Sequence, residues 1–165
     1  MAETYFASLA HHEKGDIELI SGSKKEYAFS NIFEVASNAR AHERVAVGRN
    51  LEYVQEVVRC EGVSPWFACA HDEFALCMDG EVEVEYVKLA DPRATAPQDK
   101  PGAVLAGDAP IGARMGSIRL KRGHQALLNA DCAYRFHAPG APGVLLVQTM
   151  LGELTVQRWA EICLQ

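Results

Sequence analysis

The chain of 165 residues lacks a long apolar run, a C-x-x-C pair and an excess of basic residues. A helix that crosses a bilayer needs about 20 predominantly apolar residues, and a secretory leader joins basic residues to an apolar stretch. With neither pattern present, the sequence predicts a cytoplasmic protein without a membrane partner. The net charge of −6 argues against a nucleic-acid partner, because binding a phosphate backbone requires clustered positive charge.

Cysteines are few, and their arrangement fits neither a disulfide framework nor a zinc site. They number five, an odd count, and no two of them form a C-x-x-C pair. In a cytoplasmic chain such cysteines are usually small buried side chains. The residues that we expect in the core on this basis are Cys60, Cys69, Cys77, Cys132 and Cys163.

The length and composition are those of an ordinary globular protein. With 165 residues, 48% of them hydrophobic and 23% charged, the chain is long enough for one domain and short for two. We expect an N-terminal arm over residues 1–22 and a single domain over residues 23–165. The arm carries the aromatic pair Tyr5 and Phe6, which favours docking of this arm on its own domain or on a partner subunit.

The most regular pattern lies on either side of Asp79-Gly80, a dipeptide that favours a tight hairpin turn. Residues 73–78 alternate with a period of two, which is typical of a strand. Residues 81–87 alternate strictly, with three glutamates on one face and Val82, Val84 and Tyr86 on the other. The sequence therefore predicts two strands that pair as a hairpin.

This hairpin resembles the first conserved motif of the cupin superfamily. In that motif two histidines, one residue apart, are followed after three or four residues by a glutamate and after six more by a glycine. Glu73 and Gly80 match the glutamate and the glycine. Neither spacing finds a histidine: the three-residue spacer points to Phe67 and Cys69, and the four-residue spacer points to Trp66 and Ala68.

A second cupin motif is matched by residues 120–138, which Gly123 opens. The position that would carry its histidine is Tyr134. A mononuclear metal site needs imidazoles and a carboxylate that converge on one point. At the matched positions of this chain, only the carboxylate remains. The resemblance implies an all-β cupin fold, a double-stranded β-helix or jelly-roll barrel with one or two short helices, whose own metal site is lost.

The rest of the chain is punctuated by proline and glycine, which agrees with an all-β fold. Residues 48–59 are the exception, because their apolar residues recur at helical spacing and predict a helix. Residues 89–116 hold four of the seven prolines and predict a long loop. The remaining expected elements are strands and turns over 23–47, strands over 116–122, 125–128, 133–137 and 144–150, a tight loop over 139–143, and a strand that leads into a short helix over 153–163.

Three roles for Glu73 stay open. His71 and Glu73 lie two residues apart, so with His137 or His124 they could form a metal-binding triad of two histidines and one carboxylate. Without a metal, a buried Glu73 needs a hydrogen-bond donor, for which Arg119, Arg135 and Tyr134 are candidates. A carboxylate in a cavity could also act as the general base of a metal-free isomerase.

A narrower resemblance extends over nearly the whole chain. The segments YFASLAHHEKGDIELI, GRNLEYV and SPWFACAHDEFALCMDGEVEVEYVKL resemble the small subunit of bacterial two-component hydroquinone 1,2-dioxygenases. The resemblance implies an α2β2 enzyme whose larger cupin-type subunit holds iron(II) and cleaves hydroquinone with dioxygen to 4-hydroxymuconic semialdehyde. It implies no cofactor and no catalytic residue in this chain.

Residue type and position offer candidates for contact with the larger subunit. Trp66 follows Pro65 on a segment that leads into the barrel, and a tryptophan at a pocket rim often dominates an interface. His71, Tyr5 and Phe6 are the other candidates for the interface or for part of the wall of a pocket for a small aromatic substrate. A self-sufficient metal-dependent dioxygenase and a metal-free isomerase or ligand-binding protein are the alternatives.

Overall fold

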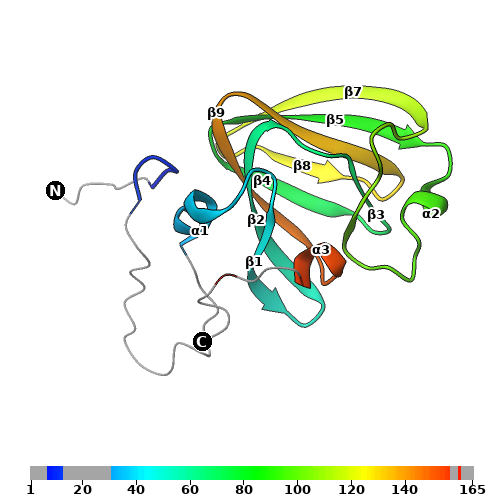
Figure 1. Ribbon diagram of the computed structural model, residues 1–165, viewed down its shortest axis with the longest axis horizontal. Coiled ribbons are helices and arrows are strands. Elements are labelled where there is room, and N and C mark those ends of the chain that lie inside the picture. Colours follow the sequence, from blue (N-terminus) through cyan, green and yellow to red (C-terminus); the bar gives the residue numbers. More distant parts are fainter. Residues whose placement is uncertain (1–6, 13–30, 157–159, 161–165) are drawn as a thin grey trace.

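The strands of the chain form one antiparallel sheet that curls back over itself. The computed structural model describes residues 7–12, 31–156 and 160, and within these ranges it has nine strands and three short helices (Figure 1). The strands are β1 (Arg44–Asn50), β2 (Tyr53–Val63), β3 (Phe67–Cys69), β4 (Glu73–Asp79), β5 (Glu81–Leu89), β6 (Ala103–Leu105), β7 (Gly112–Lys121), β8 (Gln125–Leu128) and β9 (Cys132–Met150). The helices are α1 (Ile32–Asn38), α2 (Pro92–Thr95) and α3 (Glu153–Val156). The predicted all-β fold is confirmed, and none of these helices could cross a membrane.

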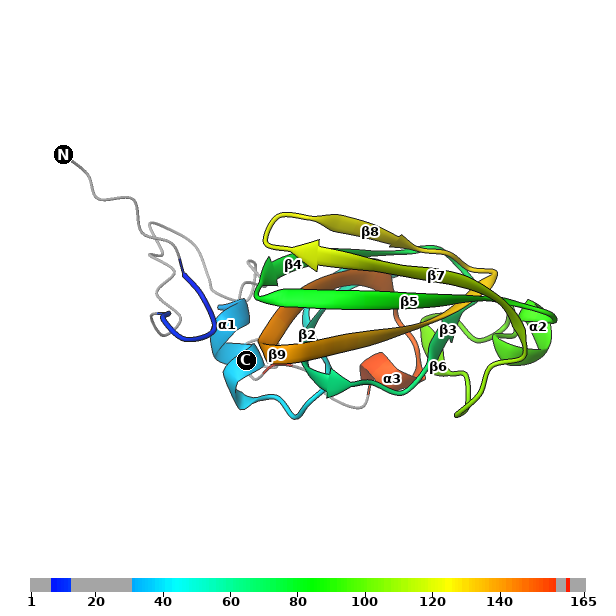
Figure 2. The same cartoon turned by 90° about the horizontal axis from the view of Figure 1, so that it is seen from above.

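Strand β9 belongs to both layers of the jelly roll. Its first part pairs with β5, with β3 and with the end of β2 at Gly62 and Val63, and its last part, Val144–Met150, pairs with β4 and with the rest of β2. One layer therefore has the order β1-β2-β9-β4-β8, and the other has the order β7-β5-β9-β3-β6. Figure 2 shows β7, β5 and β9 side by side. The main hydrophobic core contains residues of both layers, among them Leu145 and Phe136.

The predicted tight loop over 139–143 is instead a bulge inside β9. Cys60 of β2 lies opposite Gly143, and Gly62 lies opposite Ala138, so the intervening residues of β9 leave the ladder. The bulge lies where β9 passes from one layer to the other. Proline and glycine here bend a strand and do not end it.

Strands β4 and β5 are confirmed, but the hairpin pairing between them is wrong. Both strands pair with β9, on its two different parts, and they do not pair with each other. Gly80 connects them with a φ of 69°, and a Cβ atom there would lie 2.9 Å from the Cα of Gly143. The turn therefore carries the chain between the layers, and glycine is required because another backbone passes so closely.

The predicted helix over 48–59 is wrong, because these residues form the end of β1, a turn and most of β2. Asn50 pairs with Tyr53, and Leu51 in the turn has a φ of 56°. Val57 and Val58 are both buried, although they point to opposite faces of β2. A strand that is covered on both faces loses its period of two, so its apolar residues can imitate helical spacing.

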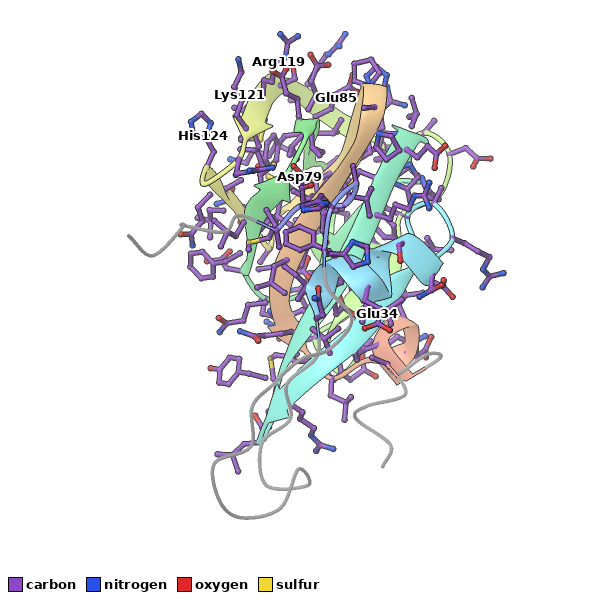
Figure 3. The ribbon with its side chains drawn as sticks, turned by 90° about the vertical axis from the view of Figure 1, so that its left-hand side faces the viewer. Glu34, Asp79, Glu85, Arg119, Lys121 and His124 are labelled. Atoms are coloured by element: carbon purple, nitrogen blue, oxygen red, sulfur yellow. The ribbon has the colours of Figure 1, made fainter. Side chains whose placement is uncertain are left out.

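Helix α1 covers the outer face of β1 and β2, in a region where the sequence predicts strands and turns. The side chain of Asn31 caps it by accepting hydrogen bonds from the Phe33 and Glu34 backbone N–H groups at 3.0 and 3.3 Å. Phe33 and Ala36 then pack against valines of the sheet. The segment 7–12 lies nearby, where the Leu9 N–H donates to Asp79 Oδ2 at 2.7 Å, and Figure 3 shows Asp79 beside this segment.

Two further expectations are corrected by short elements. The predicted loop over 89–116 contains α2, β6 and the first residues of β7. The segment after β9 forms α3 directly, without the strand predicted at its start, and Leu154 packs against the main core. Elements of three or four residues are too short to show a hydrophobic period. The proposed division into an arm over 1–22 and a domain over 23–165 stays a prediction.

Candidate functional site

The positions that carry metal ligands in cupins converge inside this jelly roll. Phe67, Cys69 and Glu73 are buried, and the rings of Phe67 and Tyr134 lie 5.9 Å apart. Tyr134 donates a hydrogen bond from its hydroxyl to Glu73 Oε2. Trp66 and Ala68 instead belong to a separate cluster with Leu89 and Ala96. The geometry therefore matches the three-residue spacer of the first cupin motif.

Arg44 of β1 reaches into this interior and contacts acidic and phenolic groups from three other strands. Its Nη2 lies 2.8 Å from Glu73 Oε1 of β4, and its Nε lies 2.6 Å from Glu56 Oε2 of β2. Its Nη1 donates to the Tyr134 hydroxyl of β9 at 3.0 Å. Thr155 of α3 completes the group by donating to Glu56 Oε1 at 2.6 Å. We call these five residues the Arg44 network.

The network is buried, with each member at most 4% exposed. Burying charged groups is costly unless each is paired and hydrogen-bonded, and here a guanidinium reaches both carboxylates. Burial lowers the pKa of Arg44, but Glu56, Tyr134 and Glu73 raise it well above its usual value. Burial raises the pKa of Tyr134, and Glu73 raises it further, so the phenol keeps the proton that it donates.

The residues at the cupin ligand positions do not fit a metal ion. Phe67 has no donor atom, and burial raises the pKa of the Cys69 thiol to about 12, with Glu73 adding to the shift. Both oxygens of Glu73 are already bonded. In residues 7–12, 31–156 and 160, no group of three or more His, Cys, Asp and Glu side chains could hold a metal. Arg44 supplies opposite Glu73 the positive charge that a metal ion would supply.

The structure does not bring His71, Glu73 and His137 together. His71 Nε2 accepts a hydrogen bond from the Gly102 N–H at 3.3 Å, in the connection between β3 and β4. His137 lies with its Nδ1 3.5 Å from Glu83. His124 is in the turn between β7 and β8, where its Nδ1 accepts from the Lys121 N–H at 3.2 Å.

Of the three donors that the sequence offers to Glu73, only Tyr134 reaches it. Arg119 pairs with Glu83, and Arg135 pairs with Glu85, and Figure 3 shows Arg119 and Glu85 at one end of the molecule, far from the centre of the jelly roll. Both oxygens of Glu73 accept hydrogen bonds and the side chain has no solvent exposure, so a substrate cannot reach Glu73 from solvent in this structure. This geometry favours the structural hydrogen bond over general-base work.

Sequence reasoning missed Arg44, Glu56 and Thr155. Each of the two charged residues stands directly before an apolar run, Arg44 in RVAV and Glu56 in EVV. On a strand, such a residue faces the same way as the buried residue two positions along. For Glu56, the helical spacing of the surrounding apolar residues hid this strand pattern. Tyr5 and Phe6 lie outside the described residues.

Trp66, the fourth interface candidate, borders a cavity of about 270 Å³ on the outer side of the layer that contains β5. The guanidinium carbon of Arg135 lies 4.6 Å from the centroid of the Trp66 ring. Arg135 is held in turn by Glu85, which accepts from its Nε at 2.8 Å. The tryptophan, the arginine and the glutamate therefore form a fixed stack.

Comparison with known proteins identifies the family. No protein-family model matches the chain, and no curated protein sequence matches it significantly. Among solved structures, hydroquinone 1,2-dioxygenase PnpCD in complex with Cd2+ and 4-hydroxybenzonitrile contains a chain that is 53% identical, with coverage of 100% of this chain and 98% of that one and a TM-score of 0.86. This chain belongs to the hydroquinone 1,2-dioxygenase family. A chain of hydroquinone 1,2-dioxygenase from Sphingomonas sp. TTNP3 with 4-hydroxybenzoate bound is 48% identical, over 97% of this chain and 95% of that one, with a TM-score of 0.88.

Two less similar structures share only the fold with this member of the hydroquinone 1,2-dioxygenase family. A longer chain of the Sphingomonas sp. TTNP3 hydroquinone 1,2-dioxygenase in complex with 4-nitrophenol is 14% identical, with a TM-score of 0.61, and 86% of this chain matches 38% of that one. A cupin-2 domain containing protein from Shewanella frigidimarina is 12% identical over 72% of this chain and 89% of that one, with a TM-score of 0.51. The cupin fold expected from the motifs is thereby confirmed.

Proposed function

We propose that this chain is the small, non-iron-bearing subunit of a two-component hydroquinone 1,2-dioxygenase. The assembled enzyme would use dioxygen to cleave hydroquinone to 4-hydroxymuconic semialdehyde during degradation of aromatic compounds. The observation that carries this proposal is the Arg44 network, which fills the metal position of a cupin with a guanidinium. The proposed reaction is that of the two relatives at 53% and 48% identity, whose chains have nearly the same length as this one.

The iron(II) of such an enzyme would belong to a larger cupin-type subunit, in an α2β2 assembly in the cytoplasm. This part of the proposal is supported by the longer chain of the Sphingomonas sp. TTNP3 hydroquinone 1,2-dioxygenase, of which this chain matches only 38%. A further structure of that name is described as a complex of PnpCD with Fe3+. A cofactor in the partner is consistent with a chain whose own motif positions cannot bind one.

The contribution of this chain would then be a rigid scaffold and part of an interface. The network links β1, β2, β4, β9 and α3, so it fixes both layers and one end of the jelly roll relative to each other. We propose Trp66, His71, Tyr5 and Phe6 as contacts with the larger subunit or with the wall of the pocket for the aromatic substrate. Trp66 is the best supported of the four, because it lines an open cavity.

Metal analysis and reconstitution test this proposal. The purified chain should contain far less than one equivalent of iron and should not cleave hydroquinone with dioxygen. Mixing it with the iron-loaded larger chain should give a complex that elutes as one species and forms the ring-cleaved product. A chain that binds iron stoichiometrically and is active alone would contradict the proposal, and so would a chain that never binds the larger one.

A further inference from the structure

The outer face of the layer β7-β5-β9-β3 is covered in part by Leu89 and Ala96, which pack on Ala68 and Ala133. Trp66, which packs against the same cluster, borders a hollow on this face. On the other layer, α1 and the segment 7–12 cover the outer face. The hollow, which we call the Trp66 pocket, has a volume of about 270 Å³. Its side walls and floor include Trp66, Glu85, Val87, Pro110, Arg114 and Arg135.

Backbone contacts hold the walls of the Trp66 pocket in place. The Ala106 N–H donates to the carbonyl oxygen of Trp66 at 2.8 Å, and the Ala90 N–H donates to that of Ile111 at 2.9 Å. At Gly112 a Cβ atom would lie 2.0 Å from the carbonyl oxygen of Lys88, so only glycine lets this segment approach β5. A pocket whose walls are fixed before binding loses little conformational entropy when it is filled.

The Trp66 pocket has one unmatched positive charge. Glu85 neutralises Arg135, with its Oε2 2.7 Å from the guanidinium. Arg114, in contrast, is exposed, and its guanidinium has no ion pair or hydrogen bond with any other residue of the described part. A planar guanidinium presents paired N–H donors that match a carboxylate. The pocket thus combines an anion-binding group with the apolar surfaces of an indole, a valine and a proline.

We propose that the Trp66 pocket receives an acidic side chain of the larger subunit, with its carboxylate on Arg114 and its aliphatic stem against Trp66. The inference rests on the proposed function. A protein segment is favoured by charge complementarity and by the surroundings. Ile111, next to Gly112 of the pocket, is 81% exposed, and Val63, which pairs with His137 of β9, is 53% exposed. Tryptophan and arginine in a pocket ringed by apolar residues are typical interface anchors.

Binding of the full-length chain to the larger subunit, measured by calorimetry at low and high salt, tests this inference. Trp66→Ala should weaken binding by about 30-fold, the typical loss at an interface anchor. Arg114→Glu should weaken it by about tenfold or more at low salt, and Arg114→Lys should weaken it less. Arg49→Glu is the matched control, because Arg49 is an exposed arginine on β1, in the other layer. Circular dichroism and the unfolding midpoint show whether each variant is folded.

The outcomes separate this inference from the proposed function. If the wild-type chain binds the larger subunit and Arg114→Glu binds as Arg49→Glu does, the pocket is not the docking site, whereas the proposed function stands. If the wild-type chain does not bind at all, the proposed function fails. Benzoate is the probe for a free ligand, in a chain whose other tryptophan carries the change Trp159→Phe. Saturable quenching of Trp66 fluorescence by benzoate that Arg114→Glu abolishes would assign the pocket to a small aromatic acid and overturn the inference.

Discussion

The Nη2 atom of Arg44 lies 2.8 Å from Oε1 of Glu73 in the sealed interior of a cupin jelly roll. Glu73 occupies the carboxylate position of the first cupin motif, so the pair places an organic cation where cupins can hold a metal ion. A guanidinium donates hydrogen bonds in several directions, and here it reaches Glu56 and Tyr134 as well. The interior of the jelly roll, which could otherwise hold a metal ion, is therefore filled by side chains that bind one another through hydrogen bonds and ion pairs.

Removing the cation should destabilise the chain strongly. Arg44→Met leaves Glu56 and Glu73 buried without their partner, and breaking a buried ion pair from one side costs about 3–5 kcal/mol. The free energy of unfolding, from urea titration followed by circular dichroism, measures this loss. The triple variant Arg44→Met, Glu56→Gln, Glu73→Gln removes all three charges and should be more stable than Arg44→Met alone. An equally unstable triple variant would show that charge imbalance is not the cause.

Glu73→Gln separates a structural role from catalysis. The amide keeps the shape of the side chain, but its NH2 group faces donors, so we expect a loss of stability of about 1–3 kcal/mol. Product formation by the enzyme assembled with the larger subunit should stay within about twofold of the wild-type rate, a barrier change below about 0.5 kcal/mol. Folded Glu73→Gln that assembles normally but has lost activity would support the general-base alternative.

Ionisation of Asp79 should make the free energy of unfolding depend on pH. Burial raises the pKa of this carboxyl, but the hydrogen bonds from the Leu9 N–H and from Arg122 outweigh burial and lower the pKa below its usual value. The folded state therefore favours the ionised form, and its contribution is present above the unfolded pKa of about 3.9 and lost as pH falls through the folded value.

Asp79→Asn should therefore be less stable than the wild-type chain at pH 7, by about 1 kcal/mol because the carboxyl is partly solvated. The difference between the two free energies of unfolding should shrink as the pH falls below about 4. Urea titrations at pH 7 and pH 3 measure it. A difference that is constant from pH 7 to pH 3 would contradict a role for ionised Asp79.

The sequence predicts the strands around Gly80 and the missing imidazoles because both depend on local spacing. Glu73 and Tyr134 follow from motif positions in the same way. Arg44 could not be found like this, since it lies in a segment without a motif and reaches Glu73 only through the order β1-β2-β9-β4. The helix predicted over 48–59 hid Glu56 for a related reason: α1 covers the outer face of β2, and two-sided burial erased the alternation. The roles of Arg44 and Glu56 both depend on packing between segments that are far apart in the sequence. Such packing cannot be predicted from the spacing of residues within one segment.

If Arg44 occupies the place of a cupin metal ion, restoring the ligands should restore metal binding only when the guanidinium is removed. The variant Phe67→His, Cys69→His, Tyr134→His, Arg44→Ala should bind about one Ni2+ per chain, since three imidazoles and Glu73 then converge on one space. The matched triple variant that keeps Arg44 should bind Ni2+ far more weakly, because the cation repels the ion and holds Glu73. Equilibrium dialysis with metal analysis gives both stoichiometries, and circular dichroism identifies the variants that fold. Should the two folded variants bind Ni2+ equally well, the guanidinium would not stand where the ion goes, and Arg44 would be a structural residue beside the lost site.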